Sequence, residues 1–157
     1  MSLPEGLKIK TLTSSDEDRP FIEAAATLSV AEIDGPMPPE ILRFAVRHKV
    51  RVIAGHLAAK ELEPLVVINQ EGDVVATASF AMLDKNEAGL MDVATREDWR
   101  DRGLGRELMK DIETKARDAG ATRIVGDPRR SAIGFYQKQG WYLPSRQRLW
   151  RKDLDID

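Results

Sequence analysis

Two glycines at the start of an amphipathic segment carry the clearest chemical signal in this sequence. Gly103 and Gly105 stand where an apolar residue begins to recur every four positions through residues 104–116, with charged residues between. This spacing predicts a helix with one apolar face. The first turn of a helix has unpartnered N–H groups and partial positive charge, and glycines let an anion approach them closely. The pattern indicates backbone binding of a diphosphate, although an ordinary tight turn would show the same two glycines.

Two common nucleotide-binding loops do not fit this stretch. No Gly-Lys-Ser/Thr follows the glycines, which excludes the phosphate loop of the nucleoside triphosphatases. Leu108 stands where a dinucleotide-binding loop would have its third glycine. A different α/β nucleotide-binding protein that uses Gly103 and Gly105 stays open as a weaker alternative.

Motifs at two separate points of the chain resemble those of one enzyme family. Arg100, Gly103 and Gly105 fill the specified positions of the Gln/Arg-x-x-Gly-x-Gly/Ala motif of the GNAT superfamily of N-acyltransferases. A second family motif, Asn-x-x-Ala-x-x-hydrophobic-Tyr followed by Gly-Phe, resembles a run near the C-terminus. Arg129 stands in place of the usual asparagine, so no contact of that asparagine is carried over. The residues that match are Ala132, Phe135, Tyr136, Gly140 and Trp141.

The resemblance implies that acyl-CoA, and acetyl-CoA in particular, is the co-substrate. In GNAT proteins the fourth and fifth strands splay apart, and the pantetheine arm lies in the gap along the strand backbone. The loop of the first motif, residues 100–105 here and called the glycine loop below, holds the diphosphate. Arg102 and Arg106 would add positive charge there, or would be ordinary solvated arginines. The cofactor-binding residues that the resemblance implies are Val93, Ala94, Thr95, Arg100, Asp101, Arg102, Gly103, Leu104, Gly105 and Arg106.

The second motif implies that Tyr136 is catalytic. Acyl transfer from a thioester to an amine needs a neutral nucleophile, stabilisation of an oxyanion and a proton for the departing thiolate. A phenol with a pKa of about 10 is protonated at neutral pH and can supply that proton. The alternative is a tyrosine that only packs on its helix. A strand N–H near Val93 or Ala94 would meet the oxyanion. Without cysteine or a recognisable Ser/His/Asp set, direct attack by the amine is favoured over an acyl-enzyme.

The general base has no carboxylate at the position that the family resemblance would assign to it. Several relatives have a glutamate on the fourth strand at the position that is Gly89 here. Asp92 and Glu87 are the nearest carboxylates, and Asp92 is the candidate base because burial within a strand can raise the pKa of a carboxyl group. A structural role for Asp92, with a water chain or a substrate-borne route for the proton, stays open.

Composition limits the other classes of function. The net charge is -2, with 24 Lys and Arg against 26 Asp and Glu, so neither a nucleic acid nor an anionic membrane is an expected partner. No apolar stretch approaches the roughly 20 residues of a membrane span, and the N-terminal residues lack the apolar core of a signal peptide. His48 and His56 have no third ligand nearby, so no metal is expected. With no cysteine, the sequence favours a cytoplasmic location.

The order of expected elements also resembles the GNAT fold. It predicts one domain over residues 1–157, of α/β (α+β) class, with a mixed sheet of six to seven strands, helices on both faces and a splay between strands 4 and 5. Ser14 and Glu17 are spaced as a capping box for the first helix. The expected strands are 7–12, 65–69, 74–83, 88–95, 122–126 and a last one from 141 toward 150. The expected helices lie within 17–32, 39–63 (with a break near Val50 and Gly55), 104–117 and 131–139.

Together these observations predict an N-acetyltransferase that moves an acetyl group from acetyl-CoA to a primary amine of a small molecule or peptide, in a ternary complex. The alternative is a non-catalytic acyl-CoA-binding or regulatory module on the same fold, which Gly89 and Arg129 favour. The acceptor and the acyl chain length are not readable from the residues. A homodimer is compatible with the resemblance, and the oligomeric state stays open.

Overall fold

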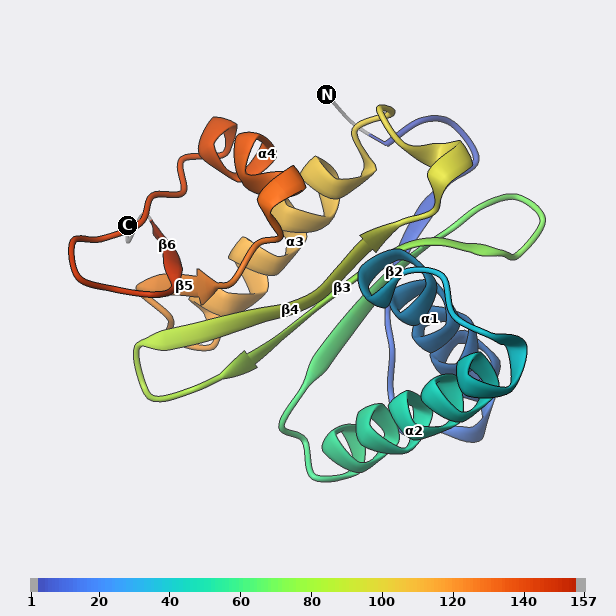
Figure 1. The fold of residues 1–157 in the computed structure, drawn as a ribbon. Coiled ribbons are helices and arrows are strands. Elements are labelled where there is room, and N and C mark those ends of the chain that lie inside the picture. Colours follow the sequence, from blue (N-terminus) through green and yellow to red (C-terminus); the bar gives the residue numbers. More distant parts are fainter. Residues whose placement is uncertain (1–2, 155–157) are drawn as a thin grey trace.

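A single mixed β-sheet forms the centre of the computed structural model, which describes residues 3–154 (Figure 1). Its six strands lie in chain order from one edge to the other. Neighbouring strands are antiparallel except for β4 and β5, which are parallel because α3 crosses over between them. The strands are β1 (Lys8–Thr11), β2 (Glu63–Ile68), β3 (Val74–Met82), β4 (Glu87–Thr95), β5 (Arg123–Gly126) and β6 (Trp150–Asp153).

Helices cover both faces of this sheet, as the sequence predicts. Figure 1 shows α1 (Arg19–Ser29) and α2 (Pro39–Ala58) on one face, and α3 (Leu104–Asp118) and α4 (Ile133–Lys138) on the other. Side chains alternate along a strand, so β2 supplies two cores. Val66 and Ile68 are buried with α1 and α2, whereas Leu65 and Val67 are buried with α3. The mixed sheet of the predicted α/β class is confirmed.

The early helices differ from the prediction in their ends. A π-helical turn at Val30–Asp34 prolongs α1, and Gly35 ends it with a φ of 82°. The predicted break near Val50 and Gly55 is wrong, because α2 runs unbroken from Pro39 to Ala58, with Ile53 and Leu57 buried on one face. Within residues 3–154, no helix has both the length and the apolar character needed to cross a membrane.

Two further local predictions are wrong. The capping box of Ser14 and Glu17 does not form, and the buried carboxylate of Asp18 instead accepts bonds from the N–H of Thr13 at 2.7 Å and its hydroxyl at 2.8 Å. The last strand begins at Trp150 rather than near 141. Trp141 is buried in the core, and Tyr142 forms only an isolated bridge with Arg151 before the chain turns away.

Candidate active site

A cavity of about 870 Å³ opens where β4 and β5 separate. The two strands pair only at residues 87–89 of β4 and 123–125 of β5. Within residues 3–154, the rest of β4 has no β5 partner and pairs with β3 only at Leu90, Met91, Ala94 and Thr95. Leu90 to Thr95 line one wall of the cavity, and the chain after Gly126 lines the other. The predicted splay between strands 4 and 5 is therefore present.

The shape of β4 changes at the same place. Ser79 of β3 pairs with Met91 and Thr77 pairs with Ala94, so two β4 residues lie opposite one β3 residue in a bulge. Asp92 is one of these two and has a φ of 55°, in the left-handed region. A bulge increases the local twist of a strand. On the other wall, β5 ends at Gly126. Pro128, two residues later, has no N–H group with which to continue the strand pairing.

The glycine loop lies at one end of the cavity and leads into α3. Asp101 and Gly103 both have left-handed backbones, with φ of 62° and 80°. Alternation of left-handed and right-handed residues turns successive N–H groups inward and makes an anion-binding concavity. The first intrahelical bond runs from the N–H of Glu107 to the carbonyl of Gly103 at 3.1 Å. The N–H groups of the preceding helical residues are therefore without intrahelical partners.

Gly105 has a packing role in addition to its place in the loop. A Cβ atom built at this position would lie 3.3 Å from Cζ of Phe135 on α4, which is tighter than ordinary van der Waals contact. The ring of Phe135 lines the same cavity. Glycine at 105 thus lets the first turn of α3 and the aromatic ring of α4 approach each other.

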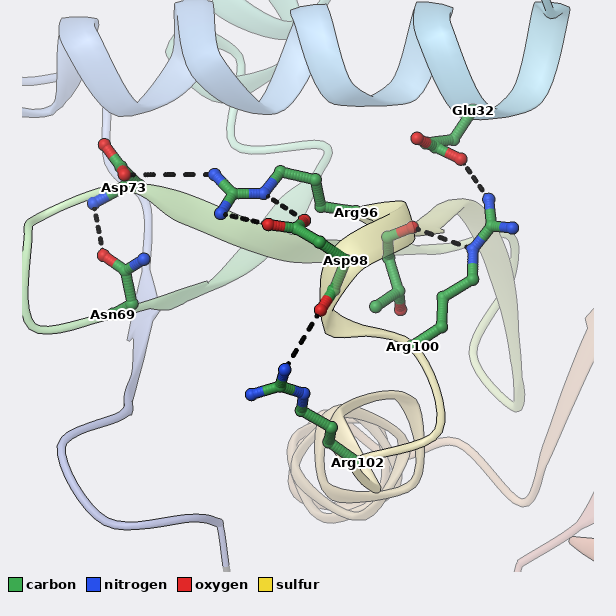
Figure 2. Close-up of polar contacts among 8 residues, drawn as sticks. Glu32, Asn69, Asp73, Arg96, Asp98, Arg100 and Arg102 are labelled. Carbon is green, nitrogen blue, oxygen red and sulfur yellow. Dashed lines mark hydrogen bonds and ion pairs between the residues drawn. The ribbon is translucent and has the colours of Figure 1, made fainter.

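The three arginines of the loop have different surroundings. The guanidinium of Arg102 lies 4.4 Å from the centre of the Trp99 ring. It also donates to the carbonyl of Asp98 at 3.2 Å (Figure 2). The guanidinium of Arg100 donates to the carboxylate of Glu32 and, at 3.4 Å, to the carbonyl of Thr95. Arg106 lines the cavity, is exposed, and has no hydrogen-bond or ion-pair partner for its side chain among residues 3–154.

Tyr136 lies in the cavity wall between two other aromatic rings. Its side chain is 5% exposed, and its ring meets those of Phe135 and Trp141 edge to face, with centroids 5.3 and 5.2 Å away. Burial raises the pKa of the Tyr136 hydroxyl to about 12, against the opposing influence of the positive charge on Arg129. The hydroxyl is therefore protonated throughout the neutral range and can act as a proton donor.

The sequence pattern of the acetyltransferase (GNAT) family matches residues 27–141. The chain belongs to this family. An amino-acid acetyltransferase of Pseudomonas putida (strain GB-1) is 31% identical over 133 residues, which are 82% of this chain and 29% of that protein. One of Pseudomonas fluorescens (strain Pf0-1) is 32% identical over 91 residues, 57% of this chain and 21% of that protein. The chain thus spans about a fifth to a third of the length of these relatives.

Solved structures show the same GNAT fold. The PaiA N-acetyltransferase of Thermoplasma acidophilum, in complex with coenzyme A, superposes with a TM-score of 0.73 at 15% identity and covers 94% of this chain and 98% of its own. An acetyltransferase of Clostridium acetobutylicum with acetyl-CoA gives a TM-score of 0.72 at 15% identity, with 96% of both chains covered. The resemblance to the GNAT fold seen in the sequence is confirmed.

Of the two carboxylates that the sequence offers as candidate bases, only Asp92 lines the cavity. Asp92 lines the cavity, and its Oδ1 accepts from Nζ of Lys49 on α2 at 2.9 Å. Glu87 does not line it, and its carboxylate accepts from Nε of Arg123 at 2.7 Å where β4 and β5 are paired. A Cβ at Gly89 would lie 3.2 Å from the side chain of Leu83, so a larger residue there would need Leu83 to move.

The structure also brings in residues that sequence reasoning missed. Glu32 and Ile33, from the π-turn after α1, line the cavity together with Trp99 and Arg129. No sequence motif marks Glu32. It is identified only because the fold brings it into contact with Arg100 at the start of the glycine loop. Neither His48 nor His56 lines the cavity, and His56 lies 2.8 Å from the carboxylate of Glu61 on the surface.

The raised pKa of Tyr136 can be measured directly, because the chain has only two tyrosines. In a Tyr142→Phe variant we expect phenolate absorbance to titrate with a midpoint of about 12, above the value of about 10 for free tyrosine. The hydroxyl of Tyr142, which donates to Asp153 at 2.8 Å, lies outside the cavity. A midpoint near that of free tyrosine would contradict the burial of the Tyr136 hydroxyl.

The same ionisation has a consequence for stability. Because the pKa of Tyr136 is higher in the folded than in the unfolded chain, its contribution is intact below pH ~10 and is lost as the pH rises toward about 12. Circular dichroism recorded at each pH therefore has to accompany the titration. A matched Tyr136→Phe variant should lack this part of the alkaline destabilisation.

Proposed function

We propose that this chain transfers the acetyl group of acetyl-CoA to a primary amine of a small molecule or peptide, by direct attack in a ternary complex. The observation that carries the proposal is the cavity between β4 and β5, which has the glycine loop of α3 at one end and Tyr136 in its wall. Membership of the GNAT acetyltransferase family supports acetyl transfer. The two structural neighbours named above contain coenzyme A and acetyl-CoA.

The residues present fit acetyl-CoA as co-substrate. The stretch of β4 at Val93, Ala94 and Thr95 has no β5 partner, so on that side it offers backbone groups to the amides of the pantetheine arm, as an added strand would use them. The N–H groups of residues 101–106 would hold the diphosphate at the start of α3, where the helix dipole favours a negative charge. Arg106, which lines the cavity without a described side-chain partner, would add a positive charge at that place.

The reaction requires one bond to form and one to break. The neutral amine attacks the thioester carbonyl, a backbone N–H near Val93 or Ala94 stabilises the oxyanion, and the carbon–sulfur bond then breaks. Tyr136 donates its proton to the departing thiolate and regains one from solvent. Asp92, or a water chain, accepts the proton that the amine loses. The overall reaction is balanced: acetyl-CoA and the amine give the acetylated amine and free CoA.

Amino acids are the first acceptor class to examine. The two Pseudomonas relatives named above are amino-acid acetyltransferases, and this chain resembles a part of each. The α-amine of an amino acid is a primary amine, which the proposed reaction can use once it is deprotonated. We therefore include amino acids beside polyamines, aminoglycosides and peptide N-termini among the candidate acceptors.

The proposed activity can be tested by measuring free CoA released from acetyl-CoA in the presence of this amine panel. We expect turnover with at least one amine, and a loss of kcat of about 100-fold in Tyr136→Phe, as general acid catalysis typically contributes. Phenylalanine keeps the ring packing, so coenzyme A affinity should not change. Thermal stabilisation by coenzyme A without turnover of any amine would instead support a non-catalytic acyl-CoA-binding module. Stabilisation by ATP or NAD but not by coenzyme A would favour another nucleotide binder.

The role of Asp92 can be separated from its ion pair. If Asp92 is the base, Asp92→Asn should lower kcat by about 100-fold, whereas Lys49→Met, which removes only the partner cation, should leave kcat within a few-fold. If Asp92 merely anchors α2 to β4, both variants should have the same small effect. Steady-state kinetics with the acceptor found above would distinguish these outcomes.

Arg102 and Arg106 provide a matched pair of variants that tests which arginine contributes positive charge to diphosphate binding. Arg106 has no described side-chain partner and lines the cavity, whereas Arg102 is held by Trp99 and Asp98. We expect Arg106→Gln to weaken coenzyme A binding about three- to ten-fold, roughly 1 kcal/mol, and Arg102→Gln to weaken it less. Calorimetric titration measures both. An equal or larger effect of Arg102→Gln would contradict the assignment of the charge to Arg106.

A further inference from the structure

Glu32 is contacted from both walls of the cavity. It lies in the π-turn at Val30–Asp34, and its side chain is 18% exposed. The guanidinium of Arg100, on the segment between β4 and α3, donates to its carboxylate (Figure 2). The guanidinium of Arg129, which follows β5, donates to its backbone carbonyl. One residue of a distant segment thus connects the two walls.

The position of these contacts matters because the strands themselves do not hold the walls together there. β4 and β5 pair no further than Gly89 and Val125. Arg100 also donates to the carbonyl of Thr95, the last residue of β4, at 3.4 Å. Through Arg100, the contact of Glu32 therefore reaches both the end of β4 and the start of the glycine loop. Through Arg129, it reaches the end of β5.

We propose that Glu32 is a positioning residue that fixes the distance between the two walls and so prepares the cavity for acyl-CoA. The proposal rests on the proposed function. A loop that is already held in place loses less conformational entropy when a ligand binds, so its affinity is higher. The proposal also assigns a contact to Arg129, which stands where the family motif commonly has asparagine.

The direction in which removal of the Glu32 charge changes coenzyme A affinity distinguishes a positioning role from a purely electrostatic one. Coenzyme A carries a negatively charged diphosphate, and the carboxylate of Glu32 is a negative charge on the same cavity. By Coulomb's law alone, removal of this charge should strengthen binding. If Glu32 acts by holding Arg100 and the loop, its removal should weaken binding.

The experiment measures coenzyme A affinity of the full chain by calorimetry. Glu32→Gln keeps the size of the side chain and removes the ion pair, and we expect a dissociation constant about three- to ten-fold higher. Arg129→Gln, which loosens the opposite wall, should change affinity in the same direction. The double variant of Glu32→Gln and Arg100→Gln should bind no more weakly than Arg100→Gln alone, because both changes remove one interaction.

Asp127→Asn is the matched control. Asp127 lines the same cavity, is exposed, and has no side-chain partner among residues 3–154. Its replacement should leave binding unchanged or make it slightly tighter. Denaturant unfolding of each variant tests for a merely structural role, since the proposal expects weaker binding without a matching loss of unfolding free energy.

The outcomes distinguish the two proposals. If the unaltered chain does not bind coenzyme A, the proposed function fails. If it binds coenzyme A, and Glu32→Gln and Arg129→Gln bind equally well or more tightly, the role of Glu32 is overturned while the proposed function stands. Additive effects of Glu32→Gln and Arg100→Gln would likewise overturn the role of Glu32, since it would then not act through Arg100.

Discussion

The short parallel pairing of β4 and β5 is the constraint on which the rest of the site depends. After three paired positions the strands diverge, and the backbone groups of β4 that face β5 are left without a strand partner. Unpaired backbone groups are costly when buried and invite pairing with another chain when exposed. The cavity keeps them accessible, so an extended ligand with its own amide groups can satisfy them. The proposed pantetheine seat follows from this arrangement of main chain.

The helix that follows has to begin at the open end of the same gap, and its apolar face ensures this. Leu104, Leu108 and Ile112 are buried against the sheet, which fixes α3 across the strands. The first turn of α3 therefore has little freedom to shift relative to β4, whereas the loop before it is exposed at Asp101 and Arg102. A polar network holds the approach to the loop, because Arg96 pairs with Asp98 at 2.6 Å just before it (Figure 2).

The sequence alone predicts those parts of this site that depend on local patterns. Gly103, Gly105 and the apolar repeat of α3 lie within one segment, so the loop and its helix could be recognised together. Glu32 could not, because its arginine partners are 68 and 97 residues away along the chain and only the fold joins them. The left-handed backbone of Asp92 and the late start of β6 likewise depend on register and on the burial of Trp141. Local residue preferences do not determine these features.

A proposed binding site for acyl-CoA that consists mostly of main-chain groups also explains why the side chains around it can vary. The two structures named above share the fold at only 15% identity to this chain, which shows how little the fold depends on particular residues. Gly89, where several relatives have a glutamate, changes a side chain but no strand pairing, since it still pairs with Val125 of β5. Side chains then matter where they hold main-chain segments in position or exchange protons. In the proposed reaction, Glu32 and Arg100 would belong to the first group, and Tyr136, with its pKa raised by burial, would belong to the second.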